Sequence, residues 1–394
     1  MSRAIEIYPL QKCIARDLEN IKSDPHNAEV MQRYYNARVA EGISIARTYK
    51  CLNTLKILSR MFGKPFETAT KDEIVELVAR FERKDLSDWT KRDYKVVLKH
   101  FFKWLRNCED VAPPEVRWIK KGHPPENRFP ILPKDLLTSD EKLAMMKATL
   151  NPRDRALIEV CSESGRRVGE ILTLHIRDVE FDEIGAKLFV NGKVGQDFAR
   201  IISSAPALAI WLDNHPLRDD ADAPVWIGLG KSNHLKQLSQ AAAASLLKNV
   251  AKRAGIPKRR MHFYLFRHTR IDETQGVLTE SQQCMMFGWR FGSRMPATYM
   301  KRYGKHIDDA QAIMNGMRPP KKETVTPIRP MQCRRCGLQN SPASKFCNRC
   351  GMVLGAENAI KIDESKRMVE ELLNAIANDP TKLQKLRALL PSRV

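Results

Sequence analysis

The chain has 394 residues, more than a single domain usually contains, so we expect at least two domains and some small additional modules. Hydrophobic residues make up 43% of the chain, enough to form buried cores, and the formal charge at pH 7 is +21. This charge favours an extended polyanion, a nucleic acid rather than a membrane, as the partner, although a proteome-wide basic bias would give the same figure. No stretch approaches the roughly 20 apolar residues of a membrane span, so we expect a cytoplasmic, nucleoid-associated protein without a membrane partner.

The first 110 residues are predicted to form consecutive helices. Thr70 and Glu73 make a capping box, and Ser87 precedes a segment whose apolar residues recur at three- and four-residue spacing. The opposite face of that segment is basic, as is one face of an earlier helix over residues 43–62. Ordinary solvated faces would explain any single lysine, but two basic faces in a cationic chain favour contact with DNA phosphates. The residues predicted to bind DNA are Arg47, Lys50, Lys91, Arg92, Lys95, Lys99 and Lys103.

Residues 111–135 are rich in proline and in basic residues, which predicts a linker that is stiff where the prolines are paired. A larger domain is expected over residues 136–318. Thr138 and Glu141 make a second capping box, and a helix break is expected at Gly165. The segment 179–204 is strand-like and is interrupted at Gly185 and at Asn191-Gly192, which predicts a short sheet.

The stretch 261–303 contains a tyrosine, Tyr299, in a strongly cationic environment. A neutral phenol with a pKa near ~10 is a poor nucleophile, so nearby positive charge is needed to favour the phenolate and to stabilise charge on an attacked phosphate. Arg267 and Arg294 lie in the same stretch. These residues suggest attack of a tyrosine on a phosphodiester, although the stretch alone does not decide it.

Five short motifs occur in a particular order along the larger domain: GRRVGEILTL at 165–174, NGK at 191–193, YLFRHTR at 264–270, FGW at 287–289 and PATYMKRY at 296–303. In this order they resemble the catalytic domain of the tyrosine recombinases, the integrase and Xer-type family, and the tryptophan-containing turn is most similar to archaeal integrases. The resemblance covers residues 135–317. The helical first third is similar to the core-binding domain of that family in general character only.

The resemblance implies a role for each matching position. Tyr299 would be the nucleophile, and Arg167 and Arg267 the two arginines, with Arg166 adjacent to the first so that the choice depends on register. Two guanidinium groups can hold the non-bridging oxygens of the transition state with forked hydrogen bonds. The site residues implied are Tyr299, Arg167, Lys193, Arg267, Trp289 and Tyr264, with His262 and His268 as auxiliary candidates.

Lys193 would supply a proton to the leaving 5′-oxygen, and Trp289 would orient its neighbours because an indole N–H only donates. Tyr264 stands where the family usually has histidine, so the group that receives the tyrosine proton is open. Because cations already stabilise the developing charge, no cofactor is expected for catalysis. The structural alternatives are that the arginines pair with Glu170, Asp178 or Asp272, and that Tyr299 is a surface aromatic.

The C-terminal part begins with a linker over residues 319–330, followed by Cys333-x-x-Cys336 and, after ten residues, Cys347-x-x-Cys350. Four thiolates with this spacing suit a closed tetrahedral Zn²⁺ site, which predicts a zinc ribbon over 331–353 with structural zinc. Such a small module has almost no core, so metal binding should supply its folding free energy. Its partner could be DNA or protein. Residues 354–394 are predicted to form an amphipathic helical tail.

The sequence therefore predicts a mainly α multidomain protein. It would contain a helical SAM-like core-binding domain over residues 1–110, an α+β catalytic domain with a small sheet, a zinc ribbon and a helical tail. The expected function is a site-specific DNA recombinase that cleaves and rejoins double-stranded DNA target sites through a 3′-phosphotyrosyl intermediate, acting as a homotetramer. The alternatives are a type IB-like topoisomerase and a non-catalytic DNA-binding regulatory protein with a degenerate site.

Overall fold

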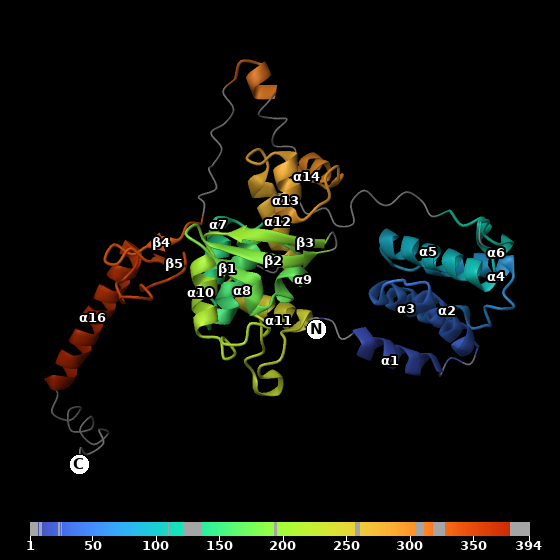
Figure 1. Cartoon of the computed structure of the whole chain (residues 1–394), viewed down its shortest axis with the longest axis horizontal. Coiled ribbons are helices and arrows are strands. Elements are labelled where there is room, and N and C mark those ends of the chain that lie inside the picture. Colours follow the sequence, from blue (N-terminus) through green and yellow to red (C-terminus); the bar gives the residue numbers. More distant parts are fainter. Residues whose placement is uncertain are drawn as a thin grey trace, which may run out of the picture. The chain divides into compact units, whose positions relative to one another are not determined.

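The computed structural model describes residues 7, 10–22, 24, 26–108, 110–120, 135–192, 195–256, 261–303, 311–317 and 328–378. The chain divides into two compact units, Tyr8–Pro130 and Met1–Ile7 with Ile131–Val394. The described residues are mostly helical with two small sheets, which confirms the predicted fold class (Figure 1). None of the helices in these ranges is both long enough and apolar enough to cross a membrane.

The first unit is a helical bundle around an aromatic core. Asn27, which is 1% exposed, ties its loops together by donating to the Ser59 hydroxyl and the Lys64 carbonyl and by accepting from the Phe66 amide. The predicted capping box of Thr70 and Glu73 is present, and Ser87 caps the following helix. The helices are α1 (Leu10–Lys22), α2 (Ala28–Ala40), α3 (Ile45–Phe62), α4 (Lys71–Glu82), α5 (Asp88–Leu105) and α6 (Pro114–Arg117).

The borders of this unit differ from the prediction at both ends. The short helix α6 lies inside the segment predicted as a linker, and Val116 and Ile119 are buried in the core of the helical bundle. Ile7 instead packs into the core of the second unit, where its carbonyl accepts from the Gln240 amide. Residues 111–135 were predicted to be a linker because they are rich in proline. Proline is nevertheless compatible with the first turn of a helix, and Pro114 begins α6.

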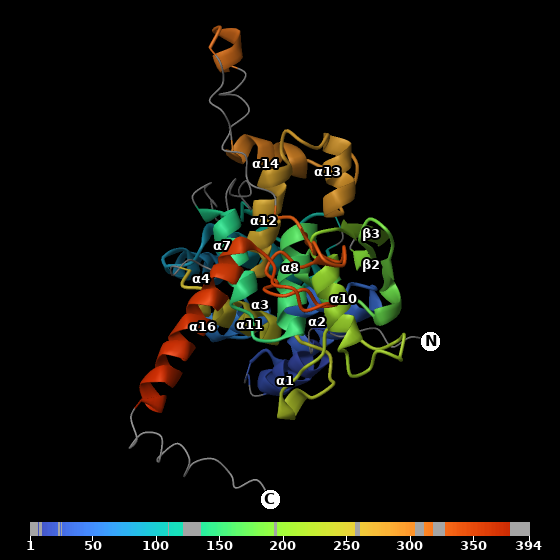
Figure 2. The ribbon, with the colours of Figure 1, turned by 90° about the vertical axis from the view of Figure 1, so that its left-hand side faces the viewer.

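In the second unit, further helices and one antiparallel sheet pack around a buried helix, α8 (Pro152–Ser164) (Figures 1 and 2). The predicted capping box of Thr138 and Glu141 begins α7 (Ser139–Lys147). The other helices that contribute are α7 (Ser139–Lys147), α9 (Val168–Leu172), η2 (Ile176–Asp178), α10 (Ala205–Asp213), η3 (Lys231–Asn233), α11 (Gln240–Arg253), α12 (Phe263–Thr274), α13 (Glu280–Phe287) and α14 (Met295–Tyr303).

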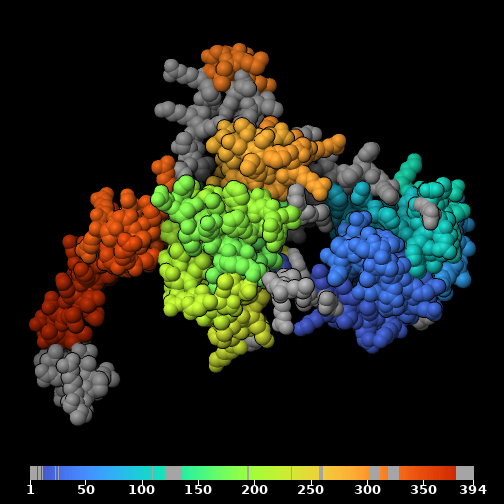
Figure 3. Space-filling view, viewed as in Figure 1, coloured from blue at the N-terminus to red at the C-terminus, as the bar shows by residue number. Residues whose placement is uncertain are grey.

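The sheet of this unit is the one predicted from the strand-like segment. Its order is β1 (Val179–Phe181), β2 (Ala186–Gly192) and β3 (Gly195–Ile201), with Leu188 opposite Ala199 and Gly192 opposite Gly195. The inward-facing residues of β2 alternate with exposed ones, as expected for a sheet with one solvated face. In both ribbon views α13 and α14 lie on the opposite side of the sheet and α8 from α11 (Figures 1 and 2). In the space-filling view the orange surface of α13 and α14 lies above the green surface of the sheet (Figure 3).

Residues 331–354 form a small module, called here the cysteine module, that contains the hairpin of β4 (Met331–Gln332) and β5 (Gln339–Asn340). The helix α16 (Ala356–Ala377) follows it, and this helix has no buried residue. The predicted apolar stripe on α16 is present and exposed at Met368, Leu372 and Leu373. The rest of the predicted tail, from residue 379, lies outside the described residues.

Candidate active site

The end of α8 brings two arginines to the centre of the second unit. The helix stops at Gly165, whose φ of 59° is in the left-handed region and whose Cβ, if it had one, would lie 2.7 Å from the Phe287 ring. Only glycine fits this turn without strain. The chain reverses there, and Arg167 becomes the N-cap residue of α9. The break predicted at Gly165 is confirmed, and it places Arg166 and Arg167 on different sides of the turn.

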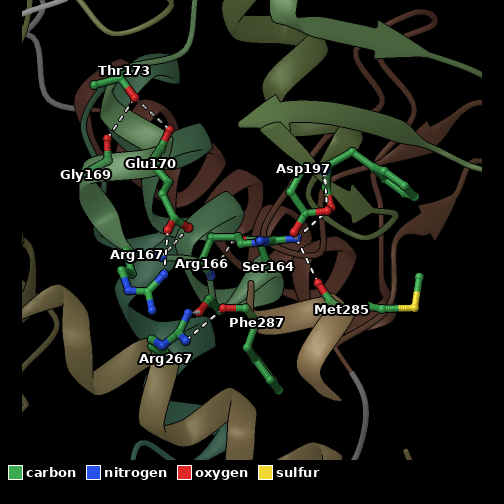
Figure 4. A network of polar contacts seen from close by, with 12 residues as sticks. Ser164, Arg166, Arg167, Gly169, Glu170, Thr173, Asp197, Arg267, Met285 and Phe287 are labelled. Carbon is green, nitrogen blue, oxygen red and sulfur yellow. Dashed lines mark hydrogen bonds and ion pairs between the residues drawn. The ribbon is translucent and has the colours of Figure 1, made fainter. Parts of the chain in front are cut away.

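Arg166 is a structural residue. Its side chain is 1% exposed, donates to the carbonyls of Phe198 (2.7 Å) and Met285 (3.0 Å), and pairs with Asp197 at 2.7 Å. It therefore ties the end of α8 to β3 and to α13. Figure 4 shows Arg166 extending toward Asp197 and Met285, away from the other two arginines.

Arg167 has a different environment, because its side chain is 38% exposed and faces an open pocket that Trp289 and Arg290 also line. Its Nη1 donates to the Glu170 carboxylate at 2.7 Å. In Figure 4 Arg167 lies close to Arg267, below Glu170. The pairing with Glu170 was one of the alternatives for this arginine, and it leaves part of the guanidinium accessible.

Arg267 lies on α12 and is 1% exposed. Its Nη1 donates to the Gly165 carbonyl at 3.0 Å and its Nη2 to the Phe287 carbonyl at 2.9 Å. The guanidinium also lies over the rings of Phe287 and Trp289, 5.5 and 5.4 Å from their centroids. Burial and the neighbouring charge of Arg167 lower the pKa of Arg267 below its ordinary value, and the interactions with Tyr264 and Tyr299 act in the opposite direction.

Tyr299 lies on α14 and is 2% exposed, so the alternative that it is a surface aromatic is wrong. Its ring stacks on Trp289 with centroids 5.6 Å apart and contacts the His268 ring at 5.3 Å. Trp289 therefore contacts both the tyrosine and Arg267. His268 also contacts Tyr264, at 4.6 Å between ring centroids.

Of the remaining predicted site residues, the structure describes Tyr264 and His262 but not Lys193. Tyr264 is 44% exposed on the first turn of α12, and His262 is the residue before that helix. Lys193 lies outside the described residues. Its neighbour Gly192 is placed, and a Cβ there would lie 3.1 Å from the Glu170 carboxylate, so the hairpin comes close to the partner of Arg167.

Part of the chain is similar in sequence to known proteins. Residues 135–272 match the phage integrase family. This part of the chain is an integrase-family domain. It is called the integrase domain below. Among curated proteins, the chain is 27% identical over 214 residues to the tyrosine recombinase XerD of Ralstonia nicotianae, covering 52% of this chain and 66% of the relative. It is 23% identical over 236 residues to the tyrosine recombinase XerA of the archaeon Pyrococcus horikoshii, covering 58% and 75%.

Solved structures share the fold of the chain. A lambda integrase dimer bound to a COC′ core site has a TM-score of 0.55 and 16% identity, covering 71% of this chain and 79% of that one. The XerH recombinase bound to palindromic difH in a post-cleavage complex has a TM-score of 0.53 and 14% identity, covering 80% and 100%. The prediction of a tyrosine recombinase or integrase fold is confirmed.

Three features of the candidate site were not predicted from the sequence. These are the structural role of Arg166, and the carbonyls of Gly165 and Phe287 that hold Arg267. Every residue type has a backbone carbonyl, so the sequence does not show which carbonyl will accept from Arg267. Phe287 is also twenty residues from Arg267 along the chain. By contrast, Arg167 and Glu170 are three residues apart, a spacing that allows an ion pair on one helical turn, and this pairing was one of the alternatives open from the sequence.

The predicted DNA-binding residues of the helical unit have contacts within their own chain. Lys99 donates to the Ile119 carbonyl at 2.9 Å, and Lys50 pairs with Asp93 at 2.7 Å. Arg47 is exposed. The other predicted residues also have partners, because Lys91 and Lys95 contact Glu82, Lys103 donates to the Asp110 carbonyl and Arg92 lies over the ring of Trp89.

The cysteine module brings its four thiols together. Their Sγ atoms all lie within 4.8 Å of one another, with Cys333 and Cys350 3.5 Å apart and Cys336 and Cys347 3.5 Å apart. The two pairs sit in matching turns, in which a glycine at φ of 70–73° follows the second cysteine. Four sulfur donors at these separations fit a tetrahedral metal site without an open position. The four cysteines could therefore hold a metal ion, as the spacing predicted.

Proposed function

We propose that this protein is a site-specific DNA recombinase that cleaves and rejoins double-stranded DNA through a 3′-phosphotyrosyl bond. The observation that carries the proposal is the position of Trp289, whose ring stacks on Tyr299 with centroids 5.6 Å apart and lies 5.4 Å from the guanidinium of Arg267. Arg167 lines the same pocket as Trp289. The two cations come from separate elements, α12 and the start of α9, and the phenol comes from a third, α14. Integrase-family membership of residues 135–272 supports the same reaction class.

In this reaction the Oη atom of Tyr299 attacks the phosphorus of the scissile phosphodiester, and the bond from phosphorus to the 5′-oxygen breaks. A guanidinium has five N–H groups, and Arg267 uses two of them on the carbonyls of Gly165 and Phe287. Its remaining donors, with the exposed part of Arg167, can hold the non-bridging oxygens. Lys193 would give a proton to the leaving 5′-oxygen, and the acceptor of the tyrosine proton is left open between Tyr264, His262 and His268.

Tyr299 is 2% exposed, so α14 would have to shift for the phenol to reach a phosphate. We propose that binding of the target duplex supplies this shift. The active assembly would be a homotetramer on two paired sites. The cysteine module would carry structural Zn²⁺, since four thiolates are the ligands of closed zinc sites.

The experiment starts from duplexes that the protein itself selects from a random pool. These duplexes are then nicked near their centre, so that a cleaved strand loses a short fragment and the covalent adduct accumulates. We expect an adduct with the wild type and none with Tyr299→Phe, whereas Tyr303→Phe, a matched change one helical turn away, should form it normally. Formation of the adduct by Tyr299→Phe would reject Tyr299 as the nucleophile.

A second assay separates the recombinase from the alternatives. Exchange of strands between two labelled duplexes is expected of a recombinase, and relaxation of supercoiled DNA without exchange would identify a type IB-like topoisomerase. DNA binding with neither activity and no adduct would identify a non-catalytic DNA-binding protein.

A further inference from the structure

The loop between the two cysteine pairs, residues 340–344, is buried although the cysteine module is very small. Asn340 and Ser341 are 0% exposed, and Ala343 and Ser344 are 4% exposed. Ala343 belongs to the apolar core of the integrase domain rather than to the module's own cluster. The strand β5, which ends in this loop, lies against α10. The module therefore has a partner within its own chain.

The polar centre of this contact is Glu159, in the middle of α8. Glu159 is 1% exposed, and its Oε1 atom accepts from the Ser341 hydroxyl at 2.5 Å. The Ser341 oxygen in turn accepts from the Ala343 amide at 3.2 Å. A carboxyl group buried to this extent costs free energy unless it has a hydrogen-bond partner. The cysteine module supplies that partner, so removing the module would leave Glu159 without it.

The shape of the loop depends on both cysteine turns. The side chain of Asn340 donates to the Leu338 carbonyl at 2.8 Å and accepts from the Asn348 amide at 3.0 Å. Leu338 follows the first cysteine pair, and Asn348 lies within the second. A metal ion that holds the two pairs together therefore also fixes the residue that precedes Ser341.

The helix that receives this contact ends at the arginines. Glu159 precedes Gly165 by six residues, or roughly 9 Å along a helix at 1.5 Å per residue. The Gly165 carbonyl holds Arg267, and Arg167 begins the next helix. On the same helix, Glu163 accepts from the backbone amides of Ile202 and Ser204. One buried helix thus joins the cysteine module, the sheet and the candidate active site.

We propose that the binding partner of the cysteine module is α8 of the integrase domain, and that metal in the module stabilises this helix. The module is a metal-dependent clasp on its own chain, and its loop 340–344 is the contact surface. Only the consequence for the arginines rests on the proposed recombinase function. The stabilisation of α8 is independent of it.

Hydrogen exchange of the full-length chain, measured by mass spectrometry with zinc bound and after chelation, tests the clasp without reference to activity. Chelation should unfold the cysteine module and should speed exchange of the α8 amides roughly 10-fold, because a buried hydrogen bond and its packing are lost. Ser341→Ala should keep one zinc per chain while α8 exchanges several-fold faster than in the wild type. Ser365→Ala, an exposed serine of α16, is the matched control and should exchange like the wild type.

The wild-type comparison remains decisive if Ser341→Ala does not fold. The proposal would be overturned if chelation speeds amide exchange in the cysteine module but leaves amide exchange in α8 unchanged. If DNA affinity also falls in that preparation, the module's partner is DNA. Failure of the proposed function would appear separately, as absence of the DNA adduct while α8 still responds to zinc.

Discussion

Arg166 and Arg167 are adjacent, but Arg166→Ala and Arg167→Gln should have opposite effects. Arg166→Ala should mainly lower stability, and Arg167→Gln should mainly abolish DNA cleavage. Arg166→Ala removes a buried guanidinium that serves two carbonyls and Asp197. Losing one partner of such a buried network costs about 3–5 kcal/mol. For a domain of this size the midpoint of thermal unfolding should fall by roughly 6–20 °C. Arg167→Gln removes an arginine that is 38% exposed. Its partner Glu170 is 6% exposed but keeps the hydrogen bond from the residue 167 amide, so the cost should be about 1–2 kcal/mol.

The effects on DNA cleavage should be reversed. Arg167→Gln should fold normally, bind DNA and form no detectable adduct, because the site would lose one of the two cations proposed to bind the phosphate. Arg166→Ala should retain adduct formation at a temperature where it is still folded. Thermal unfolding followed by circular dichroism, together with the nicked-duplex assay at 15 and 25 °C, measures both. A stable Arg166→Ala that cannot cleave, beside an Arg167→Gln that can, would refute the assignment of roles.

Three further predictions concern other parts of the chain. Burial raises the pKa of Glu159 from 4.5 to about 8. The folded state therefore binds this proton more tightly than the unfolded chain, and the free energy of unfolding should fall as pH rises from 5 to 8, by at most about 5 kcal/mol. Urea unfolding at three pH values should show that slope in the wild type but a flatter one in Glu159→Gln, and equal slopes would contradict the burial argument. Tyr264→His should leave the melting temperature unchanged, because residue 264 is 44% exposed. It should also add an ionisation near ~6.5 to the pH profile of cleavage. A pH profile without this ionisation would show that position 264 takes no part in proton transfer. Cys347→Ser should lower the zinc content, measured by plasma mass spectrometry, from one ion per chain to none, and retained zinc would argue against a four-cysteine site.

Local patterns in the sequence predicted the elements whose causes are local. The capping boxes at Thr70 and Thr138 and the helix break at Gly165 depend on residues within four positions of each other, and the structure contains all three. A short sheet was predicted from glycine-containing turns, and the structure has a three-stranded sheet there. The spacing of the four cysteines was equally sufficient to predict that they come together.

Features that depend on distant backbone could not be predicted in this way. Whether Arg166 or Arg167 faces the pocket is decided by the carbonyls of Phe198 and Met285, which have no signature in residue type. The contact between Glu159 and Ser341 joins residues 182 positions apart. The site of Ile7 was missed for the same reason, since nothing near it in the sequence indicates a place in the second core.

The most direct measurement is to map the protein residue joined to DNA in the trapped adduct. After nuclease and protease digestion, mass spectrometry should find the nucleotide on the peptide that contains Tyr299, attached through its phenol oxygen to a 3′-phosphate. A nucleotide on any other residue, or attachment through a 5′-phosphate, would contradict the proposal that Arg167 and Arg267 act with Tyr299 in DNA cleavage.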